Sequence, residues 1–349
     1  MHYCFLTSGT WEANASFVRL REFGNELLAR GHSVSCIADD YPYNVEKLPA
    51  VFNNKASIHI ARPSRGLGQI MARRRLVKQI KPDYVHVLNP FIKAYMALRL
   101  TGTRIIGDWD EWPAHRNLPF ARKAMEKFLD RWLRKHARRI VVASKYLQQE
   151  FKQRFHLDAA YIPYAAYLQP HEDGESPFTE PTAVYMGNLY PAYDHDLLFE
   201  AARILKSRGQ TPKIAILGMG PDLEKWRAFV KEHDLSNVSV PGFVSGELLW
   251  RYLRHAHVLL FPIRENLLNL CRCPSKTFAY AQTRRPVIAN RVGEVAQVLG
   301  DKGTYVNCTA EAFSEELQRA MATAYLPDVD YKIENHKWSF RTDNLLSLL

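Results

Sequence analysis

The chain has 349 residues, 47% of them hydrophobic and 24% charged, a balance that excludes a globally disordered protein. The length favours two domains, and no apolar run approaches the roughly 18 residues of a membrane-spanning helix. The first residues show no basic segment followed by an apolar one, so we expect no secretory signal.

Most of the positive charge is concentrated in one stretch. The net charge is +11, and residues 62–154 hold 22 Lys and Arg against 7 Asp and Glu, which leaves the rest of the chain slightly acidic. This pattern favours a polyanionic partner, either an anionic membrane or nucleic acid, with a merely solvated basic face as the plainer alternative. Five scattered cysteines favour a reducing, cytoplasmic setting over a disulfide framework.

Strands and helices alternate along the first half of the chain. We expect strands at 2–7, 33–38, 58–61, 84–88, 103–106 and 140–143, and helices at 16–29, 67–80, 91–100 and 120–136. Gly31 should end the first of these helices, and Ser144 should cap a helix after the last strand.

The composition then predicts a linker, because four prolines and a short acidic run lie within residues 163–181. Strands are then expected at 183–186, 213–217, 238–240, 258–261, 286–289 and 304–306, and helices at 194–208, 221–231, 246–255, 275–283 and 309–325. Both halves therefore predict an α/β fold with a doubly wound parallel sheet, in which ligands bind beyond the carboxyl ends of the strands.

Several loops after strands of the second half carry glycines. Gly187, Gly218 and Gly220 could let the backbone approach a ligand, although each could equally serve a tight turn. Lys276 falls in the first turn of a helix, where acidic residues are preferred. A bound anion such as phosphate would explain this lysine.

In the first half, the loop expected after residues 103–106 carries the carboxylates Asp108, Asp110 and Glu111 among tryptophans. These acids could supply a general base or bind a sugar hydroxyl, or they could simply cap a turn. Cys271 and Cys273 lack the spacing and the second pair of a zinc site, so we expect no metal.

The helices expected at 67–80 and 120–136 combine basic residues with large apolar ones. That combination suits an anionic lipid surface better than nucleic acid, so we expect a peripheral membrane contact and no nucleic acid. The alternative is that the apolar stripes belong to the core.

Segments spread over nearly the whole chain resemble the GT-B glycosyltransferases, specifically glycosyltransferase family 4 (group 1). They are Leu27 to Val34, Ala137 to Ser144, Tyr185 to Leu189, Ile216 to Pro221, Pro274 to Ala281, Arg285 to Ala289, Val292 to Glu294 and Trp338 to Leu349.

The resemblance implies two Rossmann-like domains facing across a cleft. Residues 1–165 would bind the acceptor, 166–181 would be a linker, 182–330 would bind the nucleotide-sugar, and 331–349 would cross back onto the first domain. The reaction would move a sugar from a UDP- or GDP-sugar to a glycan or lipid-linked acceptor. It would proceed with retention, without a metal or other cofactor, at the inner face of the membrane, as in polysaccharide biosynthesis.

Candidate site residues follow from the motifs and loops together. We expect catalytic roles for Asp110, Glu111 and Lys276, and an acceptor side at Gly9, Thr10, Asp108 and Trp109. The expected donor-binding residues are Gly187, Asn188, Gly218, Gly220, Phe243, Val244, Arg264, Asn266, Asn269, Pro274, Ser275 and Tyr280.

The chain departs from the family at three places. Cys271 and Ala279 stand where the family has two glutamates, one of which commonly holds the ribose, and residues 188–196 lack the usual basic residue. Lys276, with Arg264 or Arg272, would then have to neutralise the diphosphate. These departures leave open a non-catalytic, glycosyltransferase-like protein that binds anionic membrane or nucleic acid.

Overall fold

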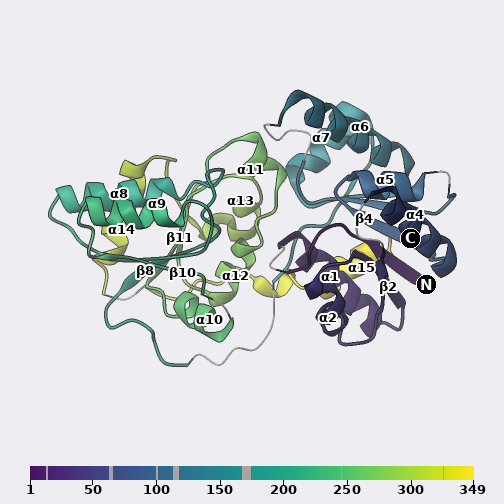
Figure 1. Ribbon diagram of the computed structural model, residues 1–349. Coiled ribbons are helices and arrows are strands. Elements are labelled where there is room, and N and C mark those ends of the chain that lie inside the picture. Colours follow the sequence, from purple (N-terminus) through teal and green to yellow (C-terminus); the bar gives the residue numbers. More distant parts are fainter. Residues whose placement is uncertain are drawn as a thin grey trace. The chain divides into compact units, whose positions relative to one another are not determined.

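The computed structural model describes residues 1–12, 15–62, 66–99, 101–112, 118–166, 174–244, 246–324 and 326–349 (Figure 1). The chain divides into two compact units. The first contains Met1–Ala165, Leu270–Cys273 and Lys337–Leu349, and the second contains Ala166–Asn269 and Pro274–His336. Residues 167–173, which make up much of the predicted linker, lie outside the described residues.

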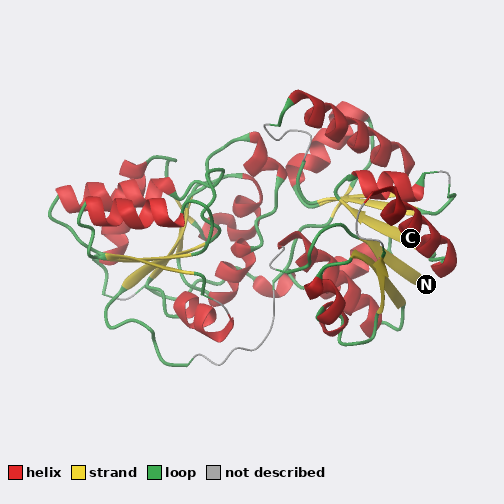
Figure 2. Ribbon diagram, in the orientation of Figure 1, coloured by secondary structure: helices red, strands yellow, loops and turns green. Residues whose placement is uncertain are grey.

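The first unit is built on a seven-stranded, wholly parallel sheet with the order β3-β2-β1-β4-β5-β6-β7 (Figure 2). Its strands are β1 (His2–Leu6), β2 (Ser33–Asp39), β3 (Ser57–Ala61), β4 (Tyr84–Leu88), β5 (Ile105–Trp109), β6 (Ala137–Val142) and β7 (Ala160–Tyr161). Its helices are α1 (Ala15–Ala29), α2 (Pro42–Glu46), α3 (Leu48–Val51), α4 (Gly66–Ile80), α5 (Ile92–Leu98), α6 (Phe120–His136), α7 (Lys145–Phe155) and α15 (Trp338–Leu346).

The second unit has a six-stranded parallel sheet with the order β10-β9-β8-β11-β12-β13. Its strands are β8 (Thr182–Met186), β9 (Lys213–Leu217), β10 (Val238–Gly242), β11 (Val258–Phe261), β12 (Val287–Ala289) and β13 (Thr304–Tyr305). Its helices are α8 (Asp196–Ser207), α9 (Leu223–Glu232), α10 (Gly246–Arg254), α12 (Lys276–Thr283), α13 (Gly293–Leu299) and α14 (Ala310–Met321), with 3-10 turns at Gly300–Lys302 and Ile333–Asn335. The short helix α11 (Leu267–Cys271) lies where the chain passes from the second unit to the first.

Two parallel α/β sheets confirm the predicted fold class. Their central strands are mostly apolar and are buried on both faces, and every residue of β4 is buried. Two predicted helix signals are also confirmed. Gly31 follows α1 with a φ of +78°, and the Ser144 hydroxyl caps α7 by accepting a hydrogen bond from the Leu147 amide at 3.1 Å.

The prediction for strand β5 was wrong at its end. The strand was expected to stop at Ile106 and release Asp108 and Trp109 into a loop, but it continues to Trp109 and pairs Asp108 with Val141 of β6. Both side chains are consequently fully buried. The loop starts only at Asp110.

Helix α15 completes the first unit by packing on α1. Trp338 contacts Phe23 edge to face, with ring centroids 5.4 Å apart, and Leu345 is fully buried. Arg30 at the end of α1 donates to the Ser339 carbonyl at 3.0 Å and to the Asp343 carboxylate at 2.9 Å. None of the described helices is both long and apolar enough to cross a bilayer.

Candidate active site

In the second unit, the two glycine loops after β8 and β9 lie backbone against backbone. A Cβ added to Gly218 would come 1.8 Å from the Gly187 carbonyl oxygen, and one on Gly220 would come 2.2 Å from the Leu189 carbonyl oxygen. The Leu189 amide also donates to the Met219 carbonyl at 2.8 Å. Gly218 and Gly220 are therefore required for the packing of the loops, which form one surface at the carboxyl edge of the sheet.

Lys276 brings a positive charge to this surface. It is the first residue of α12, and its Nζ donates a hydrogen bond to the Tyr185 hydroxyl at 3.3 Å. The same ammonium lies 4.3 Å from the ring centroids of both Tyr185 and Phe261. A Cβ on Gly187 would lie only 3.1 Å from Nζ, so the ammonium reaches the Gly187 loop.

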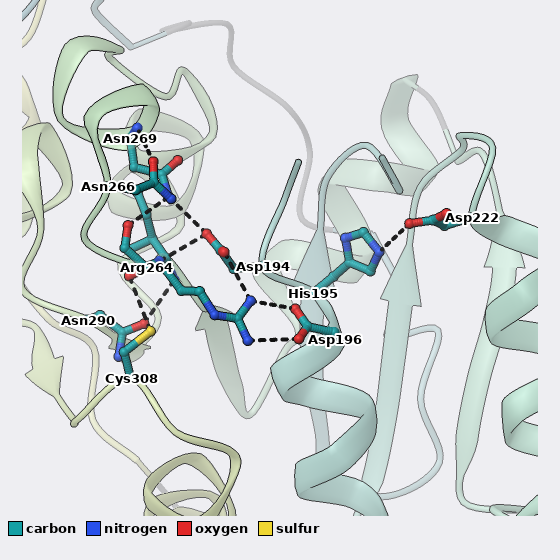
Figure 3. A network of polar contacts seen from close by, with 10 residues as sticks. Asp194, His195, Asp196, Asp222, Arg264, Asn266, Asn269, Asn290 and Cys308 are labelled. Atoms are coloured by element: carbon teal, nitrogen blue, oxygen red, sulfur yellow. Dashed lines mark hydrogen bonds and ion pairs between the residues drawn. The ribbon is translucent and has the colours of Figure 1, made fainter. Parts of the chain in front are cut away.

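Arg264 has its charge balanced by carboxylates (Figure 3). Its guanidinium donates two hydrogen bonds of 2.7 Å to Asp196 and one of 3.1 Å to Asp194. The hydrogen bonds to Asp196 are the main cause of a raised pKa for Arg264. A guanidinium held by two acids has little charge left for a diphosphate.

Two of the three asparagines predicted for donor binding, Asn266 and Asn269, belong to the same network (Figure 3). Asn269 is fully buried and donates to Asp194 at 2.9 Å and to the Arg264 carbonyl at 2.7 Å. Asn266 accepts the Asn269 amide at 2.9 Å and so begins α11. The side chain of Asn269 braces the loop after β11, where it has no exposed surface for a ligand.

The other predicted donor residues differ in exposure. Tyr280 is fully buried, where it accepts the Met186 amide at 2.8 Å and donates to the Leu260 carbonyl at 3.3 Å, so it links β8 to β11. Phe243 after β10 is 66% exposed and Asn188 is exposed. Val244, Pro274 and Ser275 are half-buried.

In the first unit, Asp108 forms a buried ion pair that sequence reasoning missed. Arg19 of α1 donates to its two oxygens at 2.7 and 3.1 Å, and the His86 Nε2 lies 2.9 Å from Oδ2. Burial opposes the charged carboxylate, but Arg19 and His86 outweigh it and lower the pKa of Asp108. Asp108 is thus a structural charge and is closed to an acceptor.

Asp110, two residues later, is held differently. It accepts hydrogen bonds from the Tyr164 hydroxyl at 2.7 Å and from the Asn89 amide group, and it is almost fully buried. Burial first, and then the charge of Glu111, raises its pKa. The neighbouring Glu111 is half-buried. Asp110 and Glu111 therefore both lie at the carboxyl end of β5, and Glu111 is the more exposed of the two.

The loop with Gly9 and Thr10 is fixed by Asp39 at the end of β2. The Gly9 amide and the Lys93 ammonium each donate to Asp39 Oδ2 at 2.8 Å, and the buried Arg73 pairs with Oδ1. The Thr10 hydroxyl accepts the Glu12 amide at 3.2 Å. A basic residue on an otherwise apolar helix face, such as Arg19 between Phe17 and Phe23, is the sequence signal that would have indicated these buried pairs.

Two family models match the chain, one on each unit. Residues 17–164 match the model described as Glycosyltransferase Family 4, and residues 180–323 match the one described as Glycosyl transferases group 1. No curated protein matches the chain.

Solved glycosyltransferase structures share the fold over the full length. A Staphylococcus aureus TarM variant, bound to UDP, fondaparinux and α-GlcNAc-glycerol, has a TM-score of 0.75 at 9% identity and covers 99% of both chains. Anabaena HepE bound to UDP-glucose has a TM-score of 0.72 at 12% identity and covers 100% of both. A glycosyltransferase from Rickettsia africae has a TM-score of 0.68 at 13% identity and covers 99% of this chain and 93% of its own.

These identities are too low to carry more than the fold. The two family models add the activity, since each matches the unit that the sheets define. The chain is therefore a GT-B glycosyltransferase of group 1, an enzyme that transfers glycosyl groups.

Proposed function

We propose that this enzyme transfers a sugar with retention from a nucleoside diphosphate sugar, UDP-linked by preference, to a glycan or lipid-linked acceptor without a metal. The position of Lys276 carries the donor half of the proposal, because it places an ammonium beside the Gly187 loop at the carboxyl edge of the sheet. HepE and TarM, which share the fold, were solved with UDP-glucose and with UDP.

Lys276 supplies the charge that residues 188–196 lack. When the bond between the anomeric carbon and the phosphate oxygen breaks, negative charge collects on the departing diphosphate, and a nearby ammonium stabilises it. Arg264 is left out of this role because Asp194 and Asp196 already hold it. In our proposal Arg264 and Asn269 instead fix the loop after β11.

Four exposed or half-buried residues of the second unit are the proposed contacts of the rest of the donor. Phe243 offers an apolar face to the base, with Val244 beside it. Asn188 and Ser275 offer polar groups to the sugar or phosphate. Tyr280 supports the site from the core without touching the ligand.

In the first unit, Asp110 and Glu111 are the proposed acids on the acceptor side. The acceptor oxygen bonds to the anomeric carbon on the face that the diphosphate leaves, so its proton passes to the departing phosphate oxygen. Asp110 or Glu111 would accept a hydrogen bond from the acceptor hydroxyl and orient it. Asn89 and Tyr164 hold the Asp110 carboxylate for this purpose.

We also propose that the reaction takes place at the cytoplasmic face of a membrane. The support is the excess of basic residues within 62–154, and a lipid-linked acceptor would be presented there.

Thermal stabilisation by UDP, GDP, ADP and CMP tests the donor site. A nucleotide far above its dissociation constant should stabilise the protein by a few kcal/mol. Lys276→Ala should weaken binding of the preferred diphosphate by roughly 10- to 100-fold, the value of one charge-assisted hydrogen bond. Lys231→Ala, an exposed lysine on α9, is the matched control.

Two results would count against this proposal. Equal affinities in the wild type and Lys276→Ala would remove Lys276 from the site. No stabilisation by any nucleotide and no donor turnover would favour a non-catalytic protein that kept the scaffold, the alternative raised by Cys271 and Ala279.

A further inference from the structure

We propose that helices α4, α5 and α6 together form a docking face for an anionic lipid bilayer. Its apolar members are Leu67, Met71, Ile92, Phe120, Met125 and Phe128, and its basic members are Arg74, Arg75, Lys78, Arg122, Lys123, Lys127, Arg131 and Lys135. The proposal deepens the membrane location given above by naming the surface and its lipid.

The three helices form one layer of the first unit (Figure 1). Helix α5 packs against both α4 and α6. Tyr95 of α5 contacts Phe128 and Trp132 of α6 edge to face, with ring centroids 5.1 and 5.2 Å apart. Residues exposed on all three helices can therefore meet one flat partner.

Large apolar side chains are exposed along this layer. Phe120 is 89% exposed, Leu67 74% and Met71 64%. Residues 120–125, the first turns of α6, are all exposed. Scattered exposed hydrophobic residues are ordinary, but a group of six on three adjacent helices indicates an interaction site.

Basic residues share the same helix faces. On α4, Leu67, Met71, Arg75 and Lys78 are spaced i, i+4, i+8 and i+11, so they form one stripe. On α6, Lys127, Arg131 and Lys135 are exposed, as are Phe120 and Phe128.

The basic members of the docking face lack acidic partners among the described residues. The three helices carry eleven Lys and Arg but two Asp and Glu. Arg73 and Lys93 pair with Asp39, and Arg134 pairs with Asp130. Among the residues that the structure describes, the eight basic members of the docking face form no ion pair.

The mixture of groups favours a bilayer over nucleic acid. Basic side chains alone would suffice for a phosphate backbone, which offers nothing to exposed Leu, Met and Ile side chains. At a lipid surface the apolar side chains enter the acyl boundary while the ammonium and guanidinium groups meet anionic headgroups. The occupant that uses both sets is an anionic membrane.

Co-sedimentation with vesicles tests the docking face directly. The wild type should bind vesicles of phosphatidylcholine with 30 mol% phosphatidylglycerol, and it should bind pure phosphatidylcholine at least tenfold more weakly. A basic side chain near an anionic surface contributes about fivefold to binding. The triple change Lys123→Gln, Lys127→Gln and Arg131→Gln should therefore weaken binding by about 100-fold.

The apolar members need a separate variant. Leu67→Ser, Met71→Ser and Phe120→Ser together should weaken binding by tenfold or more at unchanged net charge. The matched controls lie on the second unit: Lys225→Gln, Lys231→Gln and Lys302→Gln for charge, and the exposed Leu248→Ser for apolar area. All variants change exposed side chains, and an unchanged melting temperature would show that they fold.

Three outcomes would overturn the proposal: equal binding to neutral vesicles, equal loss in the control variants, or an apolar variant that binds as the wild type does. Tighter binding to duplex DNA than to the anionic vesicles would instead assign the face to nucleic acid. Because binding is measured without a donor, these failures are distinct from a failure of the donor site, which the nucleotide panel reports.

Discussion

The buried pair of Arg19 and Asp108 allows a quantitative prediction about the first unit. Both side chains have no exposed surface, and two hydrogen bonds of 2.7 and 3.1 Å join them. Arg19→Met preserves much of the side-chain volume but leaves Asp108 with His86 as its remaining partner. Removing one member of a buried pair typically costs 3–5 kcal/mol.

In Arg19→Met, the cost of keeping an unpaired Asp108 carboxylate buried cannot exceed the cost of protonating it. At pH 7, protonating a carboxyl whose ordinary pKa is 3.8 costs about 4.4 kcal/mol. The unpaired carboxylate therefore destabilises the folded state by no more than this amount. At pH 5 this upper limit is about 1.6 kcal/mol. We therefore expect a loss of about 3–5 kcal/mol at pH 7 and a loss smaller by up to about 2.7 kcal/mol at pH 5.

The contribution of Asp108 to the stability of the wild type does not change between pH 7 and pH 5. Because the folded pKa of Asp108 is lowered, its contribution to stability is fully present above 3.8 and is lost as the pH falls through the folded value. The difference between the wild type and Arg19→Met must therefore shrink on acidification. Loss of the Arg19 contacts over the Phe23 and Tyr164 rings, at 5.1 and 5.4 Å, is independent of pH.

Native-state hydrogen exchange at increasing urea is the assay, because it reports on each unit separately. Peptides from β1, β4 and β5 should lose protection, while those from β8 and β9 should not change. The double variant Arg19→Met with Asp108→Asn should regain most of the loss at pH 7, since it removes the charge. A loss of the same size at pH 5 and pH 7 would refute the reasoning.

Three further predictions concern the loops and caps. Gly218→Ala should abolish folding of the second unit, measured by thermal unfolding, because its Cβ would lie 1.8 Å from the Gly187 oxygen. The control is Gly209→Ala, whose Cβ would have nothing within 4 Å and which should cost only the roughly 1–2 kcal/mol of a left-handed backbone. Asp110→Asn should abolish most transfer activity yet leave stability at pH 7 equal or higher. A carboxylate whose folded pKa is raised destabilises the fold above that pKa, so a decrease in the urea midpoint would contradict this. Ser144→Ala should lower the free energy of unfolding by about 1–2 kcal/mol, because it removes both the cap of α7 and the hydrogen bond of 2.8 Å that the hydroxyl donates to the Cys271 carbonyl; Ser144→Thr, which keeps the hydroxyl, should cost less.

The order of elements and the fold class could be predicted because they depend on local patterns. Buried parallel strands are short apolar runs. Gly31 and Ser144 act on helix ends that are only a few residues away from them in the sequence. The short helices α11 and α13 were missed, since five to seven residues give too little periodicity. The end of β5 was missed because the buried Asp108 is paired with Arg19, 89 residues away, and with His86 on β4.

The candidate site was less predictable for the same reason. The sequence indicated that Lys276 was unusual for a first turn, but the rings of Tyr185 and Phe261 that hold its ammonium come from two other strands. The sequence offered Arg264 as a cation for the diphosphate. In the structure the carboxylates of Asp194 and Asp196, near the start of α8, pair with it. Pairing between distant segments is a property of the tertiary structure and has no local pattern.

The packing of α15 on α1 has a consequence for biosynthesis. The ribosome makes the whole second unit before it makes residues 337–349, which complete the first unit. Until then the face of α1 that packs against Trp338 is exposed to solvent. The nascent first unit is therefore incomplete and offers an apolar surface that a chaperone could recognise. The second unit can fold while it waits. A released chain that ends before residue 337 should therefore show a protease-sensitive first unit and a resistant second one.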